Sequence, residues 1–519
     1  MNTVSYLRSS ALSTALSVLC LITAEAQVVG TVPSPFESIE QNSVSNMAAI
    51  GDTLWIGPGL NRNIGNAEDW FLPQGADSII SGRGRVFSLA LVPDTVFSGL
   101  GFNFVGPEGP VQTGIGYHLS TDGGESWSFL PLPLDSESDS TFIYGGESYR
   151  RLPITVPQQS PPFDIAFNNG TIFTANWASG ILRSRNFGGH WESLVLPPAP
   201  ADSLVPDSTY RFTSATGNEN IYDPRGDQNL LGFSVHIDRR HRVWAGTAAG
   251  VNMSSDALTA PPDSIRWKHF RVDNSDLLGN WVIRITEQPA TGDIWMTNWV
   301  SGLSSSEQFG VVRTGDGGRT FQQYLVGQQI NDIGFKGTHI FAAGNEGLFI
   351  SPDNGNSWQQ VEQIRSANSF IKASARYFSV AVTSNRVWIG TSDGLASTGD
   401  LGKSWEITRV NFPLSGGNQY QSGAPDTKTF AYPNPFSPSR QALVRIKFEV
   451  REAGSVRIRL FDFGMNLVRQ LENDTFPEGT YEAVWDGRSS NGNIVANGPV
   501  FYQVTTPGGV ARGKILVID

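Results

Sequence analysis

The stretch Ser120-Thr121-Asp122-Gly123-Gly124-Glu125-Ser126-Trp127 carries a pattern, S/T-x-D-x-G-x-x-W, that returns four more times. One copy has Asn for Asp, and another has Phe for Trp. The carboxylate or amide oxygen can cap backbone N–H groups of a tight turn, glycine supplies a positive φ, and the aromatic residue starts the next strand. The pattern therefore predicts a hairpin turn with an aromatic anchor. Its key positions are Ser120, Asp122, Gly124 and Trp127; Asn186, Gly188 and Trp191; Asp316, Gly318 and Phe321; Asp353, Gly355 and Trp358; and Asp400, Gly402 and Trp405.

A second repeat, a short run of apolar and β-branched residues that ends in a small or polar residue, occurs seven times. Its aromatic residues fall 42 to 76 positions apart, and the shorter spacings match a four-stranded propeller blade. Seven copies predict seven blades. Because blades stack face to face, we interpret this aromatic stripe as core between blades rather than as a ligand contact. The stripe consists of Trp55, Phe97, Phe173, Trp244, Trp295, Phe341 and Trp388.

The eight-residue turn motif resembles the Asp-box, or BNR repeat, of sialidases, sortilin-type receptors, xyloglucanases and photosystem assembly factors. All of these are β-propellers, so the resemblance implies a propeller here. It also implies a structural role for the motif, which lies away from the active sites of those families. We expect a degraded copy near Asp69-Trp70 in blade one, and an insertion over 257–265 in place of the copy in blade four.

The composition is that of a turn-rich, all-β protein, with 56 Gly and 30 Pro in 519 residues. A net charge of -11 argues against a nucleic-acid partner, which would need a basic face. The six histidines show no metal-ligand spacing, and no dinucleotide or P-loop fingerprint stands out. We therefore expect no metal and no cofactor.

Residues 1–26 have the features of a secretory signal peptide. Arg8 precedes an apolar stretch over 11–22, and Ala24-Glu25-Ala26 forms a cleavage site before Gln27. Cys20 is the only cysteine, so the mature chain would hold no thiol and no disulfide. No later stretch approaches 18 consecutive apolar residues, which predicts no further transmembrane span.

The chain after the repeats has a different composition. Residues 413–429 are rich in Ser, Gly, Gln and Asp, which is typical of a linker before the last ninety residues. Short alternating strands follow, over 444–450, 456–461, 500–504 and 514–518, and predict a β-sandwich. The Y-P-N-P-F opening at 432–436 and the W-D-G at 485–487 resemble the C-terminal sorting domains of the type IX secretion system. Those are close to the FlgD-type immunoglobulin-like domain of flagellar hook-capping proteins.

The sequence thus predicts an all-β protein, a seven-bladed β-propeller followed by a small immunoglobulin-like β-sandwich. We expect a signal peptide over 1–26, the propeller over 27–412, a linker over 413–429 and the sorting domain over 430–519. The resemblance to sorting domains implies export through the type IX secretion machinery, to the outer cell surface or the surrounding medium.

Candidate ligand-binding residues come from a repeated N-W-x-S-G. An exposed Trp beside an amide can stack on a sugar ring and bond its hydroxyl groups, which selects Asn176 and Trp177, and Asn298 and Trp299. Packing of the blade ends is the open alternative. Two long connections, 134–162 and 197–231, are expected to flank blade three on the face opposite the turn motifs, and they add Tyr149 and Tyr222 as candidates.

No catalytic residue can be assigned from the sequence. Arg151-Leu152-Pro153 spells the R-L-P of sialidases but follows the first clear motif, and only one propeller fits where related xyloglucanases use two. We interpret the chain as a non-catalytic binder of a glycan or protein ligand. The alternative is a glycoside hydrolase, sialidase-like or xyloglucanase-like, with a carboxylate pair in the propeller channel.

Overall fold

The computed structural model describes residues 42–57, 59–65, 70–71, 85–106, 109–302, 304–366, 370–409, 428–439 and 443–519. The expected signal peptide, Asp69 and nearly all of the expected linker lie outside these residues. In the described parts the chain is almost entirely β-structure. The only helices there are two 3-10 turns, η1 (Gln228–Leu230) and η2 (Pro262–Ser264).

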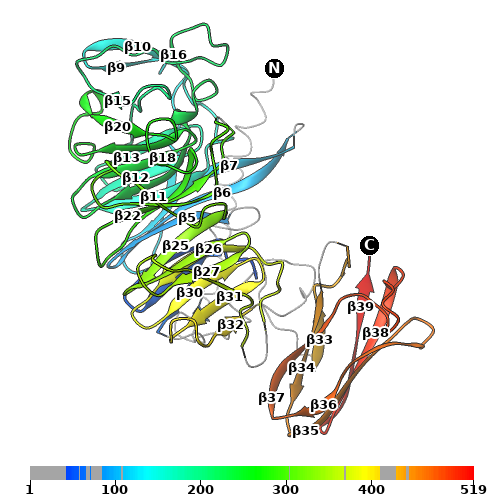
Figure 1. Ribbon diagram of the computed structural model, residues 1–519. Helices are drawn as coiled ribbons and strands as arrows, with labels where there is room; N and C mark the ends of the chain where they lie inside the picture. Colours follow the sequence, from blue (N-terminus) through cyan, green and yellow to red (C-terminus); the bar gives the residue numbers. More distant parts are fainter. Residues whose placement is uncertain are drawn as a thin grey trace.

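Seven antiparallel sheets follow one another along the described chain, each built around four consecutive strands (Figure 1). The first three comprise β1 (Asn46–Ile50), β2 (Thr53–Gly57), β3 (Asn61–Ile64) and β4 (Trp70–Phe71); β5 (Arg85–Val92), β6 (Thr95–Gly106), β7 (Gly109–Ser120) and β8 (Ser128–Pro131); and β11 (Pro162–Asn168), β12 (Thr171–Asn176), β13 (Gly180–Ser184) and β14 (Glu192–Ser193).

The fourth and fifth comprise β17 (Gly232–Ile237), β18 (Val243–Thr247), β19 (Gly250–Ser254) and β20 (Trp267–Phe270); and β21 (Trp281–Glu287), β22 (Ile294–Trp299), β23 (Gly310–Thr314) and β24 (Gln322–Tyr324). The last two comprise β25 (Ile330–Lys336), β26 (His339–Gly344), β27 (Gly347–Ser351) and β28 (Gln359–Val361); and β29 (Tyr377–Val382), β30 (Val387–Thr391), β31 (Gly394–Thr398) and β32 (Glu406–Thr408).

The sheets form a closed ring. The first strand of each sheet contacts the first strand of the next, and β29 of the last sheet contacts β1 of the first. Val44, just before β1, donates its N–H to the Thr391 carbonyl at 2.9 Å and so joins the two ends of the ring. The prediction of an all-β propeller is confirmed. The predicted aromatic stripe is core, because none of its seven side chains is more than 2% exposed.

Small polar side chains on the inner strands connect neighbouring blades. Ser88 donates its hydroxyl to the Pro162 carbonyl at 2.7 Å, and Ser234 donates to the Val282 carbonyl at 2.9 Å. In blade three the inner-strand side chain accepts the hydrogen bond instead of donating it. The Asp164 carboxylate accepts the Val235 N–H at 3.1 Å. Buried hydrogen bonds therefore fix blades two to five against one another, which explains why polar residues interrupt these apolar strands.

The five turn motifs have the geometry expected from their residues. In the first, Ser120 donates to the Asp122 carboxylate at 2.7 Å and accepts the Gly124 N–H at 2.8 Å. Asp122 in turn accepts the Ser126 N–H at 2.9 Å. Gly124 has a φ of +96°, and a Cβ there would lie 2.5 Å from the Trp55 ring of the preceding blade. The motif therefore closes its own turn and also seats one blade against the next.

Blade four keeps half of the motif. Ser254 donates to Asp256 at 2.8 Å, and Asp256 accepts the Arg266 N–H at 3.0 Å across the insertion over 257–265. The sequence places the insertion correctly, and the structure shows that it lengthens the turn without removing the capping carboxylate.

The two long connections form a small layer at the outer edge of blade four (Figure 1). Here β9 (Thr141–Tyr144), β10 (Glu147–Arg151) and β16 (Ile221–Tyr222) make one sheet, and β15 (Ser203–Leu204) pairs with β20. Tyr144 donates to the Ile265 carbonyl at 2.8 Å, and Gly145 N–H donates to the Asp263 carbonyl at 2.9 Å. These contacts reach the motif side of blade four, so the expectation that both connections open only on the opposite face differs from the structure.

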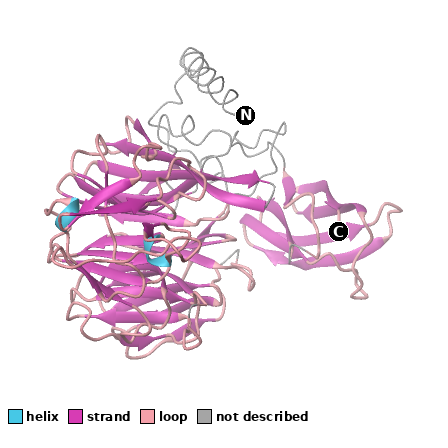
Figure 2. Cartoon of the chain, turned by 90° about the horizontal axis from the view of Figure 1, so that it is seen from above, coloured by secondary structure: helices cyan, strands magenta, loops and turns pink. Residues whose placement is uncertain are grey.

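The C-terminal part is a two-layer β-sandwich beside the ring (Figure 2). One sheet holds β33 (Thr429–Tyr432), β34 (Val444–Val450) and β37 (Gly479–Trp485). The other holds β36 (Leu467–Phe476), β35 (Gly454–Phe461), β38 (Gly498–Thr506) and β39 (Gly509–Val517).

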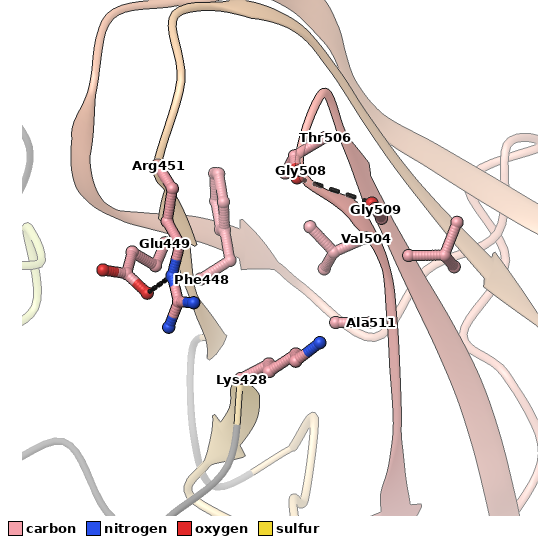
Figure 3. A pocket seen from close by; sticks show the side chains of 10 residues that line it. Lys428, Phe448, Glu449, Arg451, Val504, Thr506, Gly508, Gly509 and Ala511 are labelled. Carbon is pink, nitrogen blue, oxygen red and sulfur yellow. Dashed lines mark hydrogen bonds and ion pairs between the residues drawn. The ribbon is translucent and has the colours of Figure 1, made fainter.

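Alternate residues of these sandwich strands fill one buried core, as their period-two pattern predicts. The Y-P-N-P-F segment covers the outer edge of β39, where Asn434 accepts the Leu516 N–H at 2.8 Å. A cavity of about 60 Å³ lies at one end, between Phe448 on one sheet and Val504 on the other, with Lys428 nearby (Figure 3). It has room for only about two water molecules.

Candidate functional site

The inner strands of blades two to seven share an irregularity near their first residues. Each pairing register slips by one residue, which marks a β-bulge at the end of the blade opposite the turn motifs. A bulge turns the extra side chain out of the regular alternation. The inner strands begin at the mouth of the central channel, and each of these six blades places one bulged residue near it. These residues are Phe87, Phe163, Phe233, Ile283, Asn331 and Phe378.

A pocket of about 520 Å³ lies over blades three to five at this mouth. Four half-buried aromatic side chains, Phe163, Trp177, Phe233 and Trp281, form one wall. The Trp177 and Phe233 ring centroids are 4.8 Å apart, and those of Phe233 and Trp281 are 5.2 Å apart. The volume lies within the range of small-ligand sites, roughly 300–1,000 Å³.

The opposite wall comes from the β6–β7 hairpin. Its two strands have 12 residues each, and the hairpin projects from the ring (Figure 1). Gly114 N–H donates to the Pro157 carbonyl at 3.0 Å, and Gln159 N–H donates to the Gln112 carbonyl at 2.9 Å. The connection over 134–162, which follows this blade in the chain, therefore braces the hairpin where it meets the pocket.

Among the described residues, the pocket lining contains no charged side chain. Its polar side chains are the amides of Asn103, Gln112 and Gln159, and the remainder are aromatic, Val and Pro. Aromatic faces with a few amides suit an uncharged ligand that has both apolar faces and hydroxyl groups.

Of the candidates from the first N-W-x-S-G, Trp177 lines the pocket and Asn176 does not. Asn176 is fully buried, donates to the Thr174 hydroxyl at 2.9 Å and accepts from the Tyr117 hydroxyl at 3.1 Å. It therefore fixes the strand end that carries Trp177.

The second N-W-x-S-G lies next to the pocket without lining it. Trp299 pairs with Trp281 on the neighbouring strand, is half-buried, and donates its indole N–H to the Ile330 carbonyl at 2.8 Å. Asn298 is fully buried. Glu307 holds the following loop by accepting the Ser301 N–H at 2.7 Å.

Tyr149 and Tyr222 are placed together, but apart from the pocket. Both contact Phe142 in the layer outside blade four, with ring centroids 5.4 and 5.3 Å from it. The Tyr222 hydroxyl accepts the Leu196 N–H at 3.3 Å, and burial raises its pKa to about 12. These side chains stabilise the two long connections.

An ion bridge links inner strands across the channel. Arg284 of blade five lies 3.0 Å from Asp164 of blade three and 3.2 Å from Asp332 of blade six. Burial disfavours the charge of Arg284, but the two carboxylates outweigh it and raise the pKa of the guanidinium. Burial also raises the pKa of both carboxyl groups. Both carboxylates thus form ion pairs with the same guanidinium group.

Sequence reasoning missed Phe163, Phe233, Trp281 and the hairpin amides. A signal for the first two was present, because an aromatic residue followed by Ser or Asp opens four inner strands. The four pairs are Phe87-Ser88, Phe163-Asp164, Phe233-Ser234 and Phe378-Ser379.

No protein-family model matches this sequence, and no curated protein matches it. Among solved structures, it is similar to PorZ, a bacterial surface component of the type IX secretion system of Porphyromonas gingivalis. The identity is 15%, the TM-score is 0.35, and the match covers 92% of this chain and 75% of PorZ.

Two further structures are similar to this chain. YCF48 from Cyanidioschyzon merolae has 18% identity, a TM-score of 0.42, and coverage of 70% and 96% of this and that chain. The Niastella koreensis GH74 enzyme has 13% identity, a TM-score of 0.45, and coverage of 94% and 75%. All three TM-scores are below 0.5, so the fold assignment rests on the sheet topology of this chain.

Within the described residues, no cluster of three or more His, Cys, Asp or Glu side chains could hold a metal ion. No helix in that part of the chain is long and apolar enough to cross a membrane.

Proposed function

We propose that the propeller binds an uncharged glycan in the pocket at the channel mouth, as an exported protein of the cell surface or the surrounding medium. The observation that carries this proposal is the aromatic wall of Phe163, Trp177, Phe233 and Trp281 facing the hairpin amides. Sugar rings have apolar faces that stack on aromatic side chains and equatorial hydroxyl groups that amides can bond. A concave pocket supports a glycan over a protein ligand, whose interfaces are larger and flatter.

The same lining disfavours an acidic sugar. A sialic acid carboxylate needs arginines, and none of the described residues that line this pocket is basic. A glycoside hydrolase also needs one carboxyl group as proton donor and a second carboxylate as base or nucleophile. Asp164 and Asp332 are both paired with Arg284, so neither is free for that work. Binding without hydrolysis is therefore the function that this geometry favours.

Export completes the proposal. The signal-like segment over 1–26 and the likeness of the last ninety residues to sorting domains support secretion through the type IX machinery. In this view the sandwich is the element that the machinery recognises, and the propeller is the part that binds the ligand.

The test is a screen of soluble polysaccharides and oligosaccharides against the purified protein, with bound glycan and released sugar both measured. We expect binding of a neutral glycan and no sugar release. Trp177→Ala should weaken binding by about 1–3 kcal/mol, since an aromatic anchor is lost. Phe187→Ala is the matched control, because Phe187 is 43% exposed in a turn motif on the opposite face. Sugar release, or equal binding by both variants, would contradict the proposal.

A further inference from the structure

Four buried ionic side chains meet where the sandwich contacts blade seven. Arg409 and Asp393 belong to the propeller, and Arg445 and Glu482 belong to the sandwich. The side chains of both arginines are only 2% exposed, and those of the two acids are 12% and 8% exposed. Burying four charges between two domains is costly unless they pair with one another.

The pairing crosses the domain boundary in both directions. Arg445 lies 2.7 Å from Asp393, and Arg409 lies 3.2 Å from Glu482. Each arginine also contacts the acid of its own domain, at 3.3 Å for Arg409 and Asp393 and 3.5 Å for Arg445 and Glu482. The charges alternate around a closed square, so no member can leave without uncovering a buried opposite charge.

Neutral contacts complete the interface. The Phe370 carbonyl accepts from Arg409 at 2.9 Å and from Arg445 at 3.1 Å, and the Phe370 ring lies 5.1 Å from the Arg445 guanidinium carbon. Tyr432 donates its hydroxyl to Glu482. Phe430 of the sandwich packs against the apolar core shared by blades one and seven.

The interface lies on the same face of the ring as the pocket. Asp393 is in the turn between β30 and β31, and Phe370 and Arg409 flank the blade before β29 and after β32. That end of blade seven also carries the bulge of β29. Figure 1 shows the β6–β7 hairpin and the sandwich on the same side of the ring.

We propose that Asp393, Arg409, Arg445 and Glu482 form an interdomain lock that holds the sandwich rigidly on the pocket-bearing face of the propeller. The sandwich is then a fixed wall beside the channel mouth rather than a module that moves independently of the ring. A partner that binds the sandwich would therefore also fix the direction in which the pocket opens. This inference stands whether or not the pocket binds a glycan.

The test measures the distance between two spin labels in the full chain by pulsed electron resonance. With Cys20→Ser, the variants Glu346→Cys and Asn473→Cys place one label on the propeller and one on the sandwich, both at exposed positions. We expect a single narrow distance distribution. It should stay narrow in 1 M NaCl, because buried pairs are screened much less than exposed ones.

Glu482→Gln and Arg445→Met should each broaden the distribution while the circular dichroism stays unchanged. The matched control is Glu449→Gln, which removes an exposed ion pair with Arg451 at 2.8 Å inside the sandwich. It should leave the distribution narrow. A broad distance distribution in the protein with an unsubstituted lock would overturn the proposal. So would lock variants whose distance distributions are as narrow as that of the control. If a lock variant fails to fold, the width and salt response of the unsubstituted lock decide the question.

Discussion

At the scale of single residues, this chain uses glycine where two blades come into contact and carboxylates where a turn needs a cap. Gly124 and Gly402 both combine positive φ with close approach of a neighbouring blade. Asp122 and Asp400 both accept two or more hydrogen bonds within their own turn. These roles can be tested one residue at a time.

Gly402→Val should destabilise the protein by roughly 1–3 kcal/mol. Gly402 has a φ of +94°, which a β-branched residue adopts only with strain, and a Cβ would lie 2.8 Å from the Ile350 Cδ1 atom. Chemical denaturation measures the free energy of unfolding. Gly51→Val is a useful comparison, since Gly51 has a φ of +55° but no atom within 4 Å of the added Cβ. Equal losses would mean that blade contact contributes nothing at Gly402.

The turn motifs should lose stability in acid. Hydrogen bonds from the Ser404 hydroxyl and N–H lower the pKa of Asp400 to about 2 from its ordinary 3.8. At Asp316, burial opposes the shift, but hydrogen bonds led by that of Thr320 still bring the pKa to about 2. A carboxyl group whose pKa is lower in the folded state contributes stability above the unfolded value and loses it as pH falls. The free energy of unfolding should therefore fall between about pH 4 and pH 2.

Asp400→Asn should flatten this pH dependence in part, because Asn accepts hydrogen bonds but does not titrate in this range. Asn186 already occupies the same motif position and accepts the His190 N–H at 2.8 Å, so the variant should fold. Urea denaturation at several pH values checks it. A slope equal to that of the unsubstituted protein would contradict the assignment.

At the scale of elements, the β6–β7 hairpin differs from the other hairpins of the ring as far as the structure describes them. It extends past its blade and presents two amides to the aromatic wall across the pocket. Extended hairpins on a rigid scaffold are well suited to ligand selection, because their ends change without disturbing the blade.

Replacing both Asn103 and Gln112 with Ala should weaken glycan binding by about 1–3 kcal/mol, as two hydrogen bonds to the ligand are lost. Both residues are exposed, so the unfolding midpoint should stay unchanged. Binding isotherms with the glycan found in the screen give the affinity. Asn473→Ala, at an exposed position of the sandwich, is the control. If the double variant binds the glycan as tightly as this control, the hairpin is not part of the binding site.

At the scale of the whole molecule, the sandwich has two proposed roles, in export and in fixing the pocket. A chain ending at Gly417 separates them. We expect it to keep the ring, because the seven sheets are complete before that residue. Its unfolding midpoint should fall, since Arg409 and Asp393 lose their partners. In its native host it should accumulate in the periplasm rather than outside the cell.

Cell fractionation and thermal unfolding of the truncated protein measure both effects. Normal amounts outside the cell would rule out the sorting role. An unchanged midpoint would indicate that the interdomain contacts do not stabilise the ring. Glu482→Gln in the full chain serves as the control, because it alters the lock while keeping the whole sandwich available for export.

The sequence by itself determined the repeating parts. Local chemistry sets the turn motifs, and period-two alternation sets the strands, so blades and sandwich could be predicted from residues near one another in the chain. The N-W-x-S-G repeat also led to Trp177, since a local pattern placed it at a strand end. The sorting role and the domain boundaries stay predictions.

Only the tertiary structure decided the site. Phe163, Phe233 and Trp281 become one wall because three blades bring bulged strand ends together, and no local pattern encodes that distance. The positions of Tyr149 and Tyr222 were also decided by the tertiary structure. Their sequence context is that of exposed loop tyrosines, but they pack in the layer outside blade four. Arg445 and Asp393 are 52 positions apart, and their contact exists because the ring and the sandwich bury opposite charges against each other. Contacts between residues far apart in the chain depend on how complete blades and sheets pack against one another. A single sequence does not show that packing.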